Sequence, residues 1–475
     1  MAIVAALVGL LLLSAVHWYL WKRLVADVSA PGGWYRRAGT VLLVLLPVTT
    51  LLFQWGGQAG VPFPVKQVVA WPGSYWVAML LYLLLALAVG EALRPLLLRV
   101  LRRRDAGRAA APPAEREQEQ EQEQEQERER RREEERVAAG GVPGVSASSA
   151  TPGAARGTDG VAAPSGSGSG PGPVSGSGGA GGPGEPAGEP MAAADGPGRT
   201  EAGRRLFVAR TVAVGAGLVA AGTVGYGSYR FRRLTTKHVR VPLAKLPRAA
   251  HGYRIAVVSD IHLSAILGAS HSRRIVDAIN RTQPDLITVV GDMVDAEVTD
   301  LRSAAAPLAE LSAPDGAYFV TGNHEYYVDT LQWVEHVREL GMIPLENARV
   351  ELPYFDLAGV NDVQGEGTVH GGPDFEAALG DRDRQRASVL MAHQPVLIHD
   401  AVDAGVDLQL SGHTHGGQMW PVTYLADLAN PTLAGLERYG DTQLYVSRGA
   451  GAWGPPVRVG ADPDITVIEL AATGA

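Results

Sequence analysis

Histidines and carboxylates follow short apolar runs at five places in the second half of this 475-residue chain. The runs are "IAVVS", "LITVVG", "YFVTG", "VLMA" and "LQLSG". The polar residues after them are, in order, Asp260 and His262; Asp292 and Asp295; Asn323, His324 and Glu325; His393; and His413 and His415. Carboxylates, imidazoles and an amide, without sulfur, suit Mn, Fe or Zn. The absence of cysteine excludes thiolate metal sites, cysteine nucleophiles and disulfides.

The spacing within these groups suggests that two side chains of one group can bind the same ion. Residues i and i+2 of an extended chain point the same way, so we expect Asp260 and His262 to reach one point, and likewise His413 and His415. A glycine directly precedes the second, third and fifth groups, which is typical of tight turns or close backbone approach. Asp-x-His alone is most simply a turn with a surface histidine, Gly-Asp-x-x-Asp alone is similarly weak, and Gly-Asn-His-Glu is a stronger signal. Five groups in succession favour a common metal site.

The elements that must position these residues are short apolar runs between about Arg254 and Leu470. Continuous apolar runs are typical of strands buried on both faces. Segments 272–282 and 330–340 have helical spacing between some of the runs. We therefore predict a layered α/β domain over residues 238–475. Ligands of such domains bind just beyond the carboxyl ends of the strands, where the five polar groups would meet.

The N-terminal region, residues 1–104, is predicted to hold three transmembrane helices, at about 2–21, 38–55 and 75–93. A signal peptide is the alternative for the first. Lys22, Arg23, Arg36 and Arg37 lie between the first and second runs, and several arginines follow the third from Arg99 on. The positive-inside rule then places the N-terminus outside and the segment after Arg99 in the cytoplasm.

Residues 105–202 are predicted to be a low-complexity, disordered linker, rich first in Glu, Gln and Arg and then in Gly, Ser and Pro. A spacer is the simpler interpretation, and a partner-binding tail the alternative. Residues 203–229 predict a fourth transmembrane helix or a twin-arginine-like signal anchor, from Arg204, Arg205 and Phe207. Either would carry the C-terminal domain out of the cytoplasm, although basic residues between Arg230 and Lys237 oppose that orientation.

The order and content of the five groups, from about Arg254 to Leu470, resemble the calcineurin-like metallophosphoesterases. The likeness is greatest to a membrane-anchored or exported bacterial branch with a Gly-His-Thr-His-Gly-Gly-Gln motif, which stands here at residues 412–418. This resemblance implies a four-layer αββα sandwich of two mixed sheets with helices on both outer faces. It also implies hydrolysis of phosphate mono- or diesters by a hydroxide that bridges two divalent metal ions, Mn, Fe or Zn.

The resemblance also implies a role for each polar residue. It assigns one ion to Asp260, His262 and His415, and the other to Asn323, His393 and His413, with Asp292 bridging both. It makes His324 the catalytic histidine, with Asp295 as a plausible partner that orients it.

Partners are less well defined by the sequence. The net charge is −8 and the C-terminal part is acidic, so nucleic acid is not expected as a partner. The expected partners are the membrane and a phosphate ester, and a tether near the bilayer favours lipid-linked or envelope substrates. The alternative function is a non-catalytic membrane scaffold or sensor that retains the fold; the complete set of ligand residues argues against it.

Overall fold

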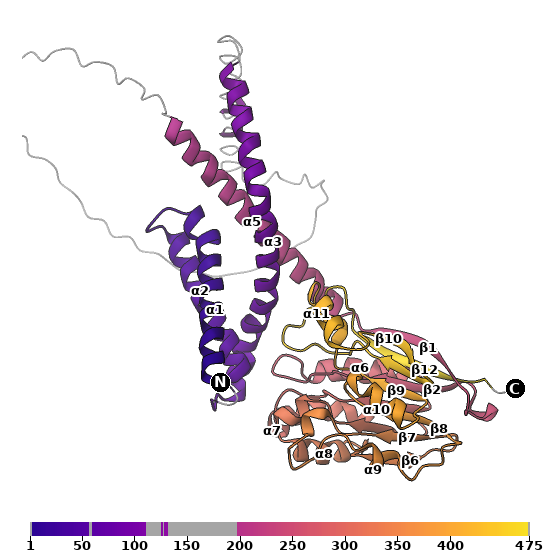
Figure 1. Cartoon of the computed structure of the whole chain (residues 1–475). Helices are drawn as coiled ribbons and strands as arrows, with labels where there is room; N and C mark the ends of the chain where they lie inside the picture. The colour runs from indigo at the N-terminus through magenta and orange to yellow at the C-terminus, as the bar shows by residue number, and fades with distance from the viewer. Residues whose placement is uncertain (1, 57–58, 111–124, 127, 132–196, 474–475) are drawn as a thin grey trace, which may run out of the picture. The chain divides into compact units, whose positions relative to one another are not determined.

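The computed structural model describes residues 2–56, 59–110, 125–126, 128–131 and 197–473 (Figure 1). These form two compact units, Met1–Pro95 with Leu206–Ala475, and Leu96–Arg205. Most of the predicted linker, residues 105–202, lies outside the described residues. In the second unit, Arg102 pairs with Glu201 at 2.6 Å, and Arg204 pairs with Asp105 at 2.5 Å.

Four long helices precede the C-terminal domain: α1 (Ala2–Leu24), α2 (Trp34–Trp55), α3 (Phe63–Ala110) and α5 (Pro197–Phe231). Within the described residues, three stretches are long and apolar enough to cross a membrane: Trp34–Trp55, Phe63–Gly107 and Glu201–Phe231. The predicted first span forms α1 but is not among the three, so its membrane role stays a prediction. Helix α3 begins well before the predicted third span, and Pro72 and Pro95 lie inside it.

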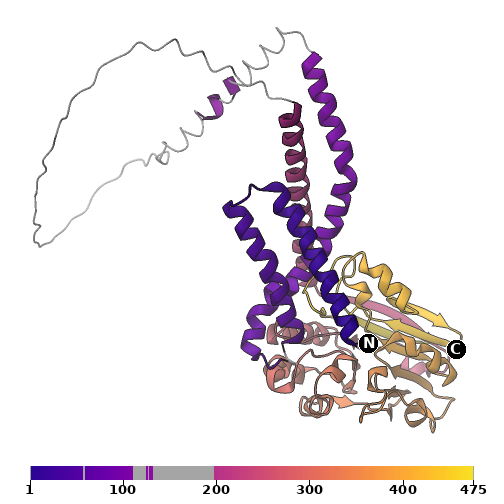
Figure 2. The same ribbon diagram turned by 60° about the vertical axis from the view of Figure 1, so that its left-hand side comes forward.

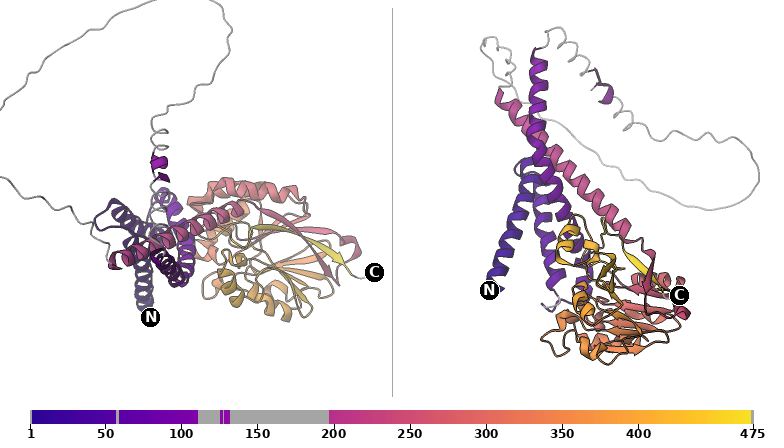
Figure 3. Two further views of the ribbon diagram at one scale, coloured as in Figure 1. Left: turned by 90° about the horizontal axis from the view of Figure 1, so that it is seen from above. Right: turned by 45° about the vertical axis from the view of Figure 1, so that its right-hand side comes forward.

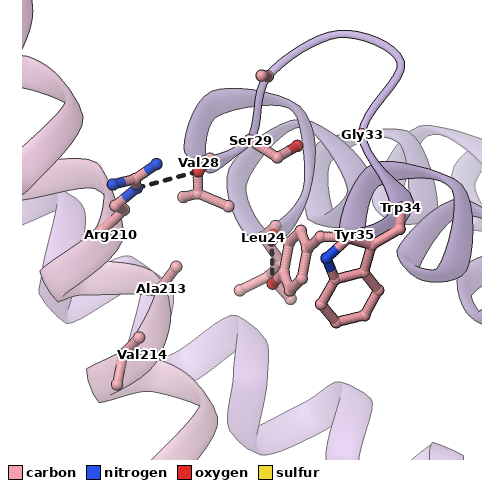
Figure 4. Close-up of a pocket in the computed structure, with 10 residues that line it drawn as sticks. Leu24, Val28, Ser29, Gly33, Trp34, Tyr35, Arg210, Ala213 and Val214 are labelled. Carbon is pink, nitrogen blue, oxygen red and sulfur yellow. Dashed lines mark hydrogen bonds between the residues drawn. The ribbon is translucent and has the colours of Figure 1, made fainter. Parts of the chain in front are cut away.

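Figure 4 shows a hydrogen bond between the α1–α2 turn and α5, and another within the turn. Arg210 of α5 donates from Nε to the carbonyl oxygen of Val28 at 3.1 Å, and the Tyr35 hydroxyl donates to the carbonyl oxygen of Leu24 at 3.0 Å. A pocket of about 470 Å³ lies among these residues, with Trp34 and Val214 also in its wall. Arg210, near the start of the apolar stretch of α5, therefore has a backbone partner.

The C-terminal domain contains two six-stranded sheets. The first, in spatial order, is β1 (Thr235–Leu243), β12 (Asp464–Ala472), β2 (Tyr253–Val258), β3 (Leu286–Val290), β4 (Ala317–Val320) and β5 (Ile343–Pro344). The second is β10 (Gly435–Tyr439), β11 (Thr442–Val446), β9 (Leu408–Ser411), β8 (Ala387–Met391), β7 (Phe355–Gly359) and β6 (Ala348–Glu351). Both sheets are mixed: β12 runs antiparallel to β2, and β6 to β7, while β2–β3–β4 and β7–β8–β9 are parallel.

Helices cover the outer faces of the sheets, and the view from above in Figure 3 (left) shows helices on both sides of the strands. These helices are α6 (Ala269–Arg281), α7 (Val298–Ala305), α8 (Thr330–Glu339), α9 (Phe375–Leu379) and α10 (Ile398–Asp403), and the domain also contains α11 (Val422–Ala429). The 3₁₀ turns are η1 (Ala26–Val28), η2 (Arg248–Ala250), η3 (Ala306–Glu310), η4 (His324–Tyr327), η5 (Val363–Gly365), η6 (Pro395–Leu397) and η7 (His415–Gly417). Figure 2 gives a second view of the same elements.

Three buried apolar layers explain this arrangement. One lies between the sheets and includes Val290 and Phe355. The second packs α6, α7 and α8 on the first sheet and includes Val289 and Trp333. The third packs α9 and α10 on the second sheet. Val289 and Val290 face different layers because successive side chains of a strand alternate sides, so all of β3 is apolar apart from Thr288.

The predicted αββα sandwich is thus confirmed. Its first strand, β1, begins at Thr235, slightly before the predicted domain start at residue 238.

Candidate metal centre

All five polar groups lie just after the carboxyl ends of strands. Asp260 follows β2, Asp292 follows β3, and Asn323 follows β4 in the first sheet. His393 follows β8 and His413 follows β9 in the second sheet. Each set of three strands is parallel, so its carboxyl ends meet at one edge. The sandwich brings those two edges together, and side chains up to 153 positions apart in the chain come within hydrogen-bonding distance.

The backbone at this rim is not extended. The expectation that an extended chain makes residues i and i+2 point the same way here was therefore wrong. Five of the residues have positive φ values, between 51° and 70°: Asp260, His262, Asp292, His413 and His415. This left-handed conformation is uncommon for residues other than glycine and costs about 1 kcal/mol or more at each position. Side chains held in this way at one rim are a sign of a functional site.

Glycines at the rim permit close backbone approach, as the sequence predicted. A Cβ atom at Gly322 would overlap Oδ1 of Asp292 and its backbone nitrogen, and one at Gly412 would overlap the carboxylate of Asp260. Oδ1 of Asp292 accepts a hydrogen bond from the backbone N–H of His324 at 2.9 Å. The second and third groups are therefore packed directly against each other.

Asp260, His262 and His415 form one cluster, whose candidate ligand atoms all lie within 4.8 Å of one another. His262 donates from Nδ1 to Asp295 at 2.8 Å, which leaves its Nε2 to face inward. That Nε2 atom is 3.0 Å from Nε2 of His415, which is 3.4 Å from Oδ1 of Asp260. A carboxylate oxygen and imidazole nitrogens thus surround one small space.

Asp292, His393 and His413 form a second cluster with the same spread. Nδ1 of His413 is 2.9 Å from Oδ1 of Asn323, so the amide oxygen joins it. His393 donates from Nδ1 to the carbonyl oxygen of Val290 at 2.8 Å, which leaves its Nε2 to face the cluster. This buried Nε2 has no hydrogen-bond partner and faces Oδ2 of Asp292 at 3.2 Å.

A buried imidazole nitrogen that faces a carboxylate calls for a positive charge between them, as a proton or as a metal ion. Burial by itself lowers the pKa of His393, but the Asp292 carboxylate outweighs burial and raises this pKa well above its ordinary value. The site therefore favours positive charge at Nε2, which a metal ion supplies as well as a proton. Asp292 also lies 3.8 Å from Nε2 of His262, between the two clusters. The donor set fits divalent metals.

His324 lies beside the clusters on η4, with Nδ1 at 2.8 Å from Oδ1 of Asp295. Burial lowers the pKa of His324, but Asp295 more than offsets this and raises it to about 9. Asp295 also accepts from His262, and the two histidines keep the pKa of Asp295 below its ordinary value although burial acts the other way. Without metal ions, His324 is therefore protonated at neutral pH and can donate from its other nitrogen.

Glu325 has a positioning role that the sequence did not reveal. Its buried carboxylate accepts hydrogen bonds from the backbone N–H groups of Gly322 (2.7 Å), Asp292 (3.0 Å), Met293 (2.7 Å) and Val294 (3.3 Å). Burial raises the pKa of Glu325 to about 7. The Gly-Asn-His-Glu motif marks Glu325 as a polar residue after a strand. Which backbone N–H groups its carboxylate binds depends on the pairing of β3 with β4.

Arg458 is a second positioning residue, and it carried no sequence signal. It is fully buried, and it donates from Nη1 to the carbonyl oxygen of His415 at 2.7 Å. Its Nη2 atom lies 3.1 Å from Nδ1 of the same histidine, and its Nε donates to the carbonyl oxygen of Gly451 at 3.0 Å. Burial lowers the pKa of Arg458 to about 10. Arg458 thus fixes the loop that presents His415.

A cavity of about 700 Å³ opens beside Asp295 and His324. Tyr327 and Trp453 line it, and Trp453 stands edge-on to His324 with ring centroids 6.1 Å apart. Residues before and at the start of α3 also line it, including Val61, Phe63 and Lys66. Trp453 thus lies in the wall of this cavity, whereas Trp420 is not among the lining residues.

Asp362 caps η5, because its side chain accepts from the backbone N–H of Gln364 at 2.8 Å. It also accepts a hydrogen bond from Nε2 of Gln394 at 2.9 Å. Both of these contacts are structural, so they give Asp362 a local role in the turn.

Residues 253–417 match the family model for calcineurin-like phosphoesterases. An uncharacterised metallophosphoesterase of Helicobacter pylori is 34% identical over 56% of this chain and 72% of its own length. Another from Aquifex aeolicus is 32% identical over 51% of this chain and 93% of its own length. The chain belongs to the calcineurin-like phosphoesterase family. Residues 253–417 therefore belong to a domain of a metal-dependent phosphoesterase family, and the αββα sandwich and the clustered carboxylates and histidines agree with that assignment.

Another similar protein is named as a transmembrane protein. A protein of Danio rerio named "Transmembrane protein with metallophosphoesterase domain" is 38% identical over 49% of this chain and 56% of its own length. The chain thus spans little more than half of that relative. In this chain, three helices of the described residues are long and apolar enough to cross a membrane. A solved dimetal phosphatase from Danio rerio aligns over 42% of this chain and 88% of that chain, with 14% identity and a TM-score of 0.30, and the family assignment does not depend on it.

Proposed function

We propose that this chain is a membrane-tethered phosphoesterase that hydrolyses phosphate mono- or diesters with two divalent ions. One ion would be held by Asp260, His262 and His415, the other by Asn323, His393 and His413, with Asp292 between them. The observation that carries the proposal is the buried Nε2 of His393, which has no hydrogen-bond partner and faces the Asp292 carboxylate at 3.2 Å.

When bound, such ions acidify water and neutralise the charge of a phosphate group. The protein's own groups do the rest. His324 pairs with Asp295 and lines the cavity, so it can donate a hydrogen bond or proton to a phosphoryl or leaving-group oxygen. Asp295 holds the Nδ1 side of that ring, which leaves Nε2 free for the substrate. Asn323 is a neutral ligand and preserves the positive charge that an anionic substrate needs.

The test compares His324→Ala with a matched control, His399→Ala. His399 is an exposed histidine of α10, away from the clusters. We expect His324→Ala to keep its bound metal but to lower turnover of phosphate esters by about 10²–10⁴-fold, and the control to leave both unchanged. Phosphate release and diester cleavage would be measured with Mn, Fe and Zn each added back. Unchanged turnover in His324→Ala would remove this histidine from the mechanism.

We also propose a multi-pass arrangement with the phosphoesterase domain outside the cytoplasm. The positive-inside rule places the segment between α2 and α3 outside, on the same side as the domain that follows α5. The lining of the cavity supports this, because Phe63 and Lys66 share it with His324 and Trp453. Lys66 also lies 3.5 Å from Asp300 of α7. Protection of the domain from protease added to intact spheroplasts would refute this orientation, whereas cleavage is expected.

A site next to the bilayer makes lipid-linked or envelope phosphate esters the proposed substrates. The aromatic side chains of Phe63, Tyr327 and Trp453 around the cavity suit a substrate with an apolar part. A comparison of long-chain and short-chain phosphate esters tests this, and equal kcat/KM for both would count against it.

A further inference from the structure

Helix α11 (Val422–Ala429) is an apolar helix with no buried residue in the otherwise well-packed phosphoesterase domain. Tyr424, Leu425 and Leu428 are 64%, 67% and 86% exposed, and Trp420 just before the helix is 49% exposed. The helix carries one charged residue, Asp427. Large apolar side chains gathered on one exposed element mark a surface that is covered by something else.

The end of α5 shows where this surface lies. Tyr226 and Tyr229 are exposed near the carboxyl end of this candidate membrane span, at 55% and 50%, and exposed arginines, Arg232 and Arg233, follow them. Tyrosines at the end of a membrane helix sit at the level of the lipid headgroups, and arginines beyond them pair with lipid phosphates. The headgroup level of the bilayer therefore passes close to Gly227, which lies between the two tyrosines.

A chain of backbone contacts places α11 at the same level. The carbonyl oxygen of Gly227 accepts from the N–H of Arg458 at 3.0 Å, and the carbonyl oxygen of Val459 accepts from the N–H of Trp420 at 2.8 Å. Arg230 also pairs with Asp462 in the same loop. Figure 1 shows α11 at the edge of the domain where α5 ends. The loop before α11 is thus held directly to the end of the membrane span.

We propose that α11 is a membrane-contact helix, with Tyr424, Leu425, Leu428 and Trp420 inserted into the interface of the bilayer that α5 crosses. A lipid surface fits better than a protein partner because the helix adjoins a membrane span at its headgroup level. The inference rests on the proposed function in one respect. The same segment carries His415, five positions before Trp420, so insertion of α11 would hold the metal clusters next to phosphate groups of that leaflet. The substrate class is then an amphiphilic phosphate ester presented by the bilayer.

A fluorescent probe tests the contact itself in the full-length chain reconstituted into phosphatidylcholine and phosphatidylglycerol vesicles. Because the chain has no cysteine, Leu428→Cys gives a single labelling site for a polarity-sensitive dye. Leu331→Cys on α8, a leucine 60% exposed, is the matched control. We expect a blue-shifted emission and quenching by brominated lipids at position 428 but not at 331. An emission at position 428 typical of water would overturn the proposal. A blue-shifted emission without quenching by brominated lipids would also overturn it and would mean that a protein covers the helix.

An activity measurement tests the consequence for substrates. Leu425→Asp with Leu428→Asp should lower hydrolysis of a long-chain phosphate ester in the same vesicles by about tenfold or more. The same preparation should cleave a soluble aryl phosphodiester at the wild-type rate, and Leu331→Asp should change neither activity. An equal loss on both substrates, or no loss on either, would refute the role of α11 in substrate access. If the wild-type protein cleaves neither substrate, the proposed function fails, while the dye experiment still decides the membrane contact.

Discussion

Replacement of Glu325 by glutamine should empty the metal centre although Glu325 is not itself a proposed ligand. Each carboxylate oxygen accepts from two backbone N–H groups: Oε2 from Gly322 and Asp292, and Oε1 from Met293 and Val294. Glutamine keeps one oxygen and turns the other into an NH₂ group. Two buried N–H groups then lose their acceptor and face a donor.

The cost follows from the number of N–H groups left unpaired. Each buried, unsatisfied N–H costs about 1–3 kcal/mol, so Glu325→Gln should destabilise the domain by about 2–6 kcal/mol. For a domain of this size, that corresponds to a fall in Tm of roughly 4–24 °C. Because the strain falls on the backbone of Asp292, which is held in a left-handed conformation, the ligand between the two clusters should lose its position first.

Elemental analysis of the purified protein and thermal melting with and without added Mn or Zn would measure this effect. We expect less bound metal in Glu325→Gln and a smaller rise in Tm on addition of metal than in the wild type. Glu310→Gln is the control, since Glu310 is an exposed carboxylate paired with Arg273 on the surface. Wild-type metal content together with a wild-type Tm in Glu325→Gln would refute the argument that this carboxylate holds the ligand loop.

Three further predictions concern other residues. Asp292→Ala should remove metal from at least one cluster, which elemental analysis would show, and full metal content would contradict its central position. Burial lowers the pKa of His271 to about 3, below its ordinary value of 6.5. Between these two pH values the unfolded chain binds a proton at His271 and the folded chain does not. The stability that neutral His271 contributes is therefore present above pH 6.5 and is lost as pH falls towards 3, and the loss is about 2 kcal/mol at pH 5. We expect His271→Gln to reduce the difference in unfolding free energy between pH 7 and pH 5 by that amount. Arg458→Met should leave the fold intact but weaken metal binding at the cluster that contains His415, seen as a higher metal concentration for half-maximal activity; an unchanged metal requirement would limit Arg458 to packing.

The family places few limits on the substrate. The matching relatives from Helicobacter pylori and Aquifex aeolicus are themselves named as uncharacterised, and the match to the transmembrane relative from Danio rerio covers 56% of that protein. The apolar helices and the exposed helix α11 are the features of this chain that bear on the substrate. The experiments on lipid substrates therefore address what family membership leaves open.

The sequence by itself determined the kind of chemistry and the kind of fold. Residue type alone restricts the ligands, since Asp260, His393 and His415 offer oxygen and nitrogen donors and no thiolate exists in the chain. Continuous apolar runs demand strands buried on both faces, so a layered α/β domain also follows from local pattern.

Only the tertiary structure decided how the site is built. The local rule of an extended backbone failed because the rim residues adopt left-handed conformations, which packing between neighbouring loops imposes. The roles of Glu325 and Arg458 depend on contacts between segments distant in the chain, and no local pattern encodes which backbone groups such side chains will meet. The same holds for α11: its apolar residues are visible in the sequence, but whether they are buried or exposed is set by how the whole chain packs, because burial is a property of the assembled layers.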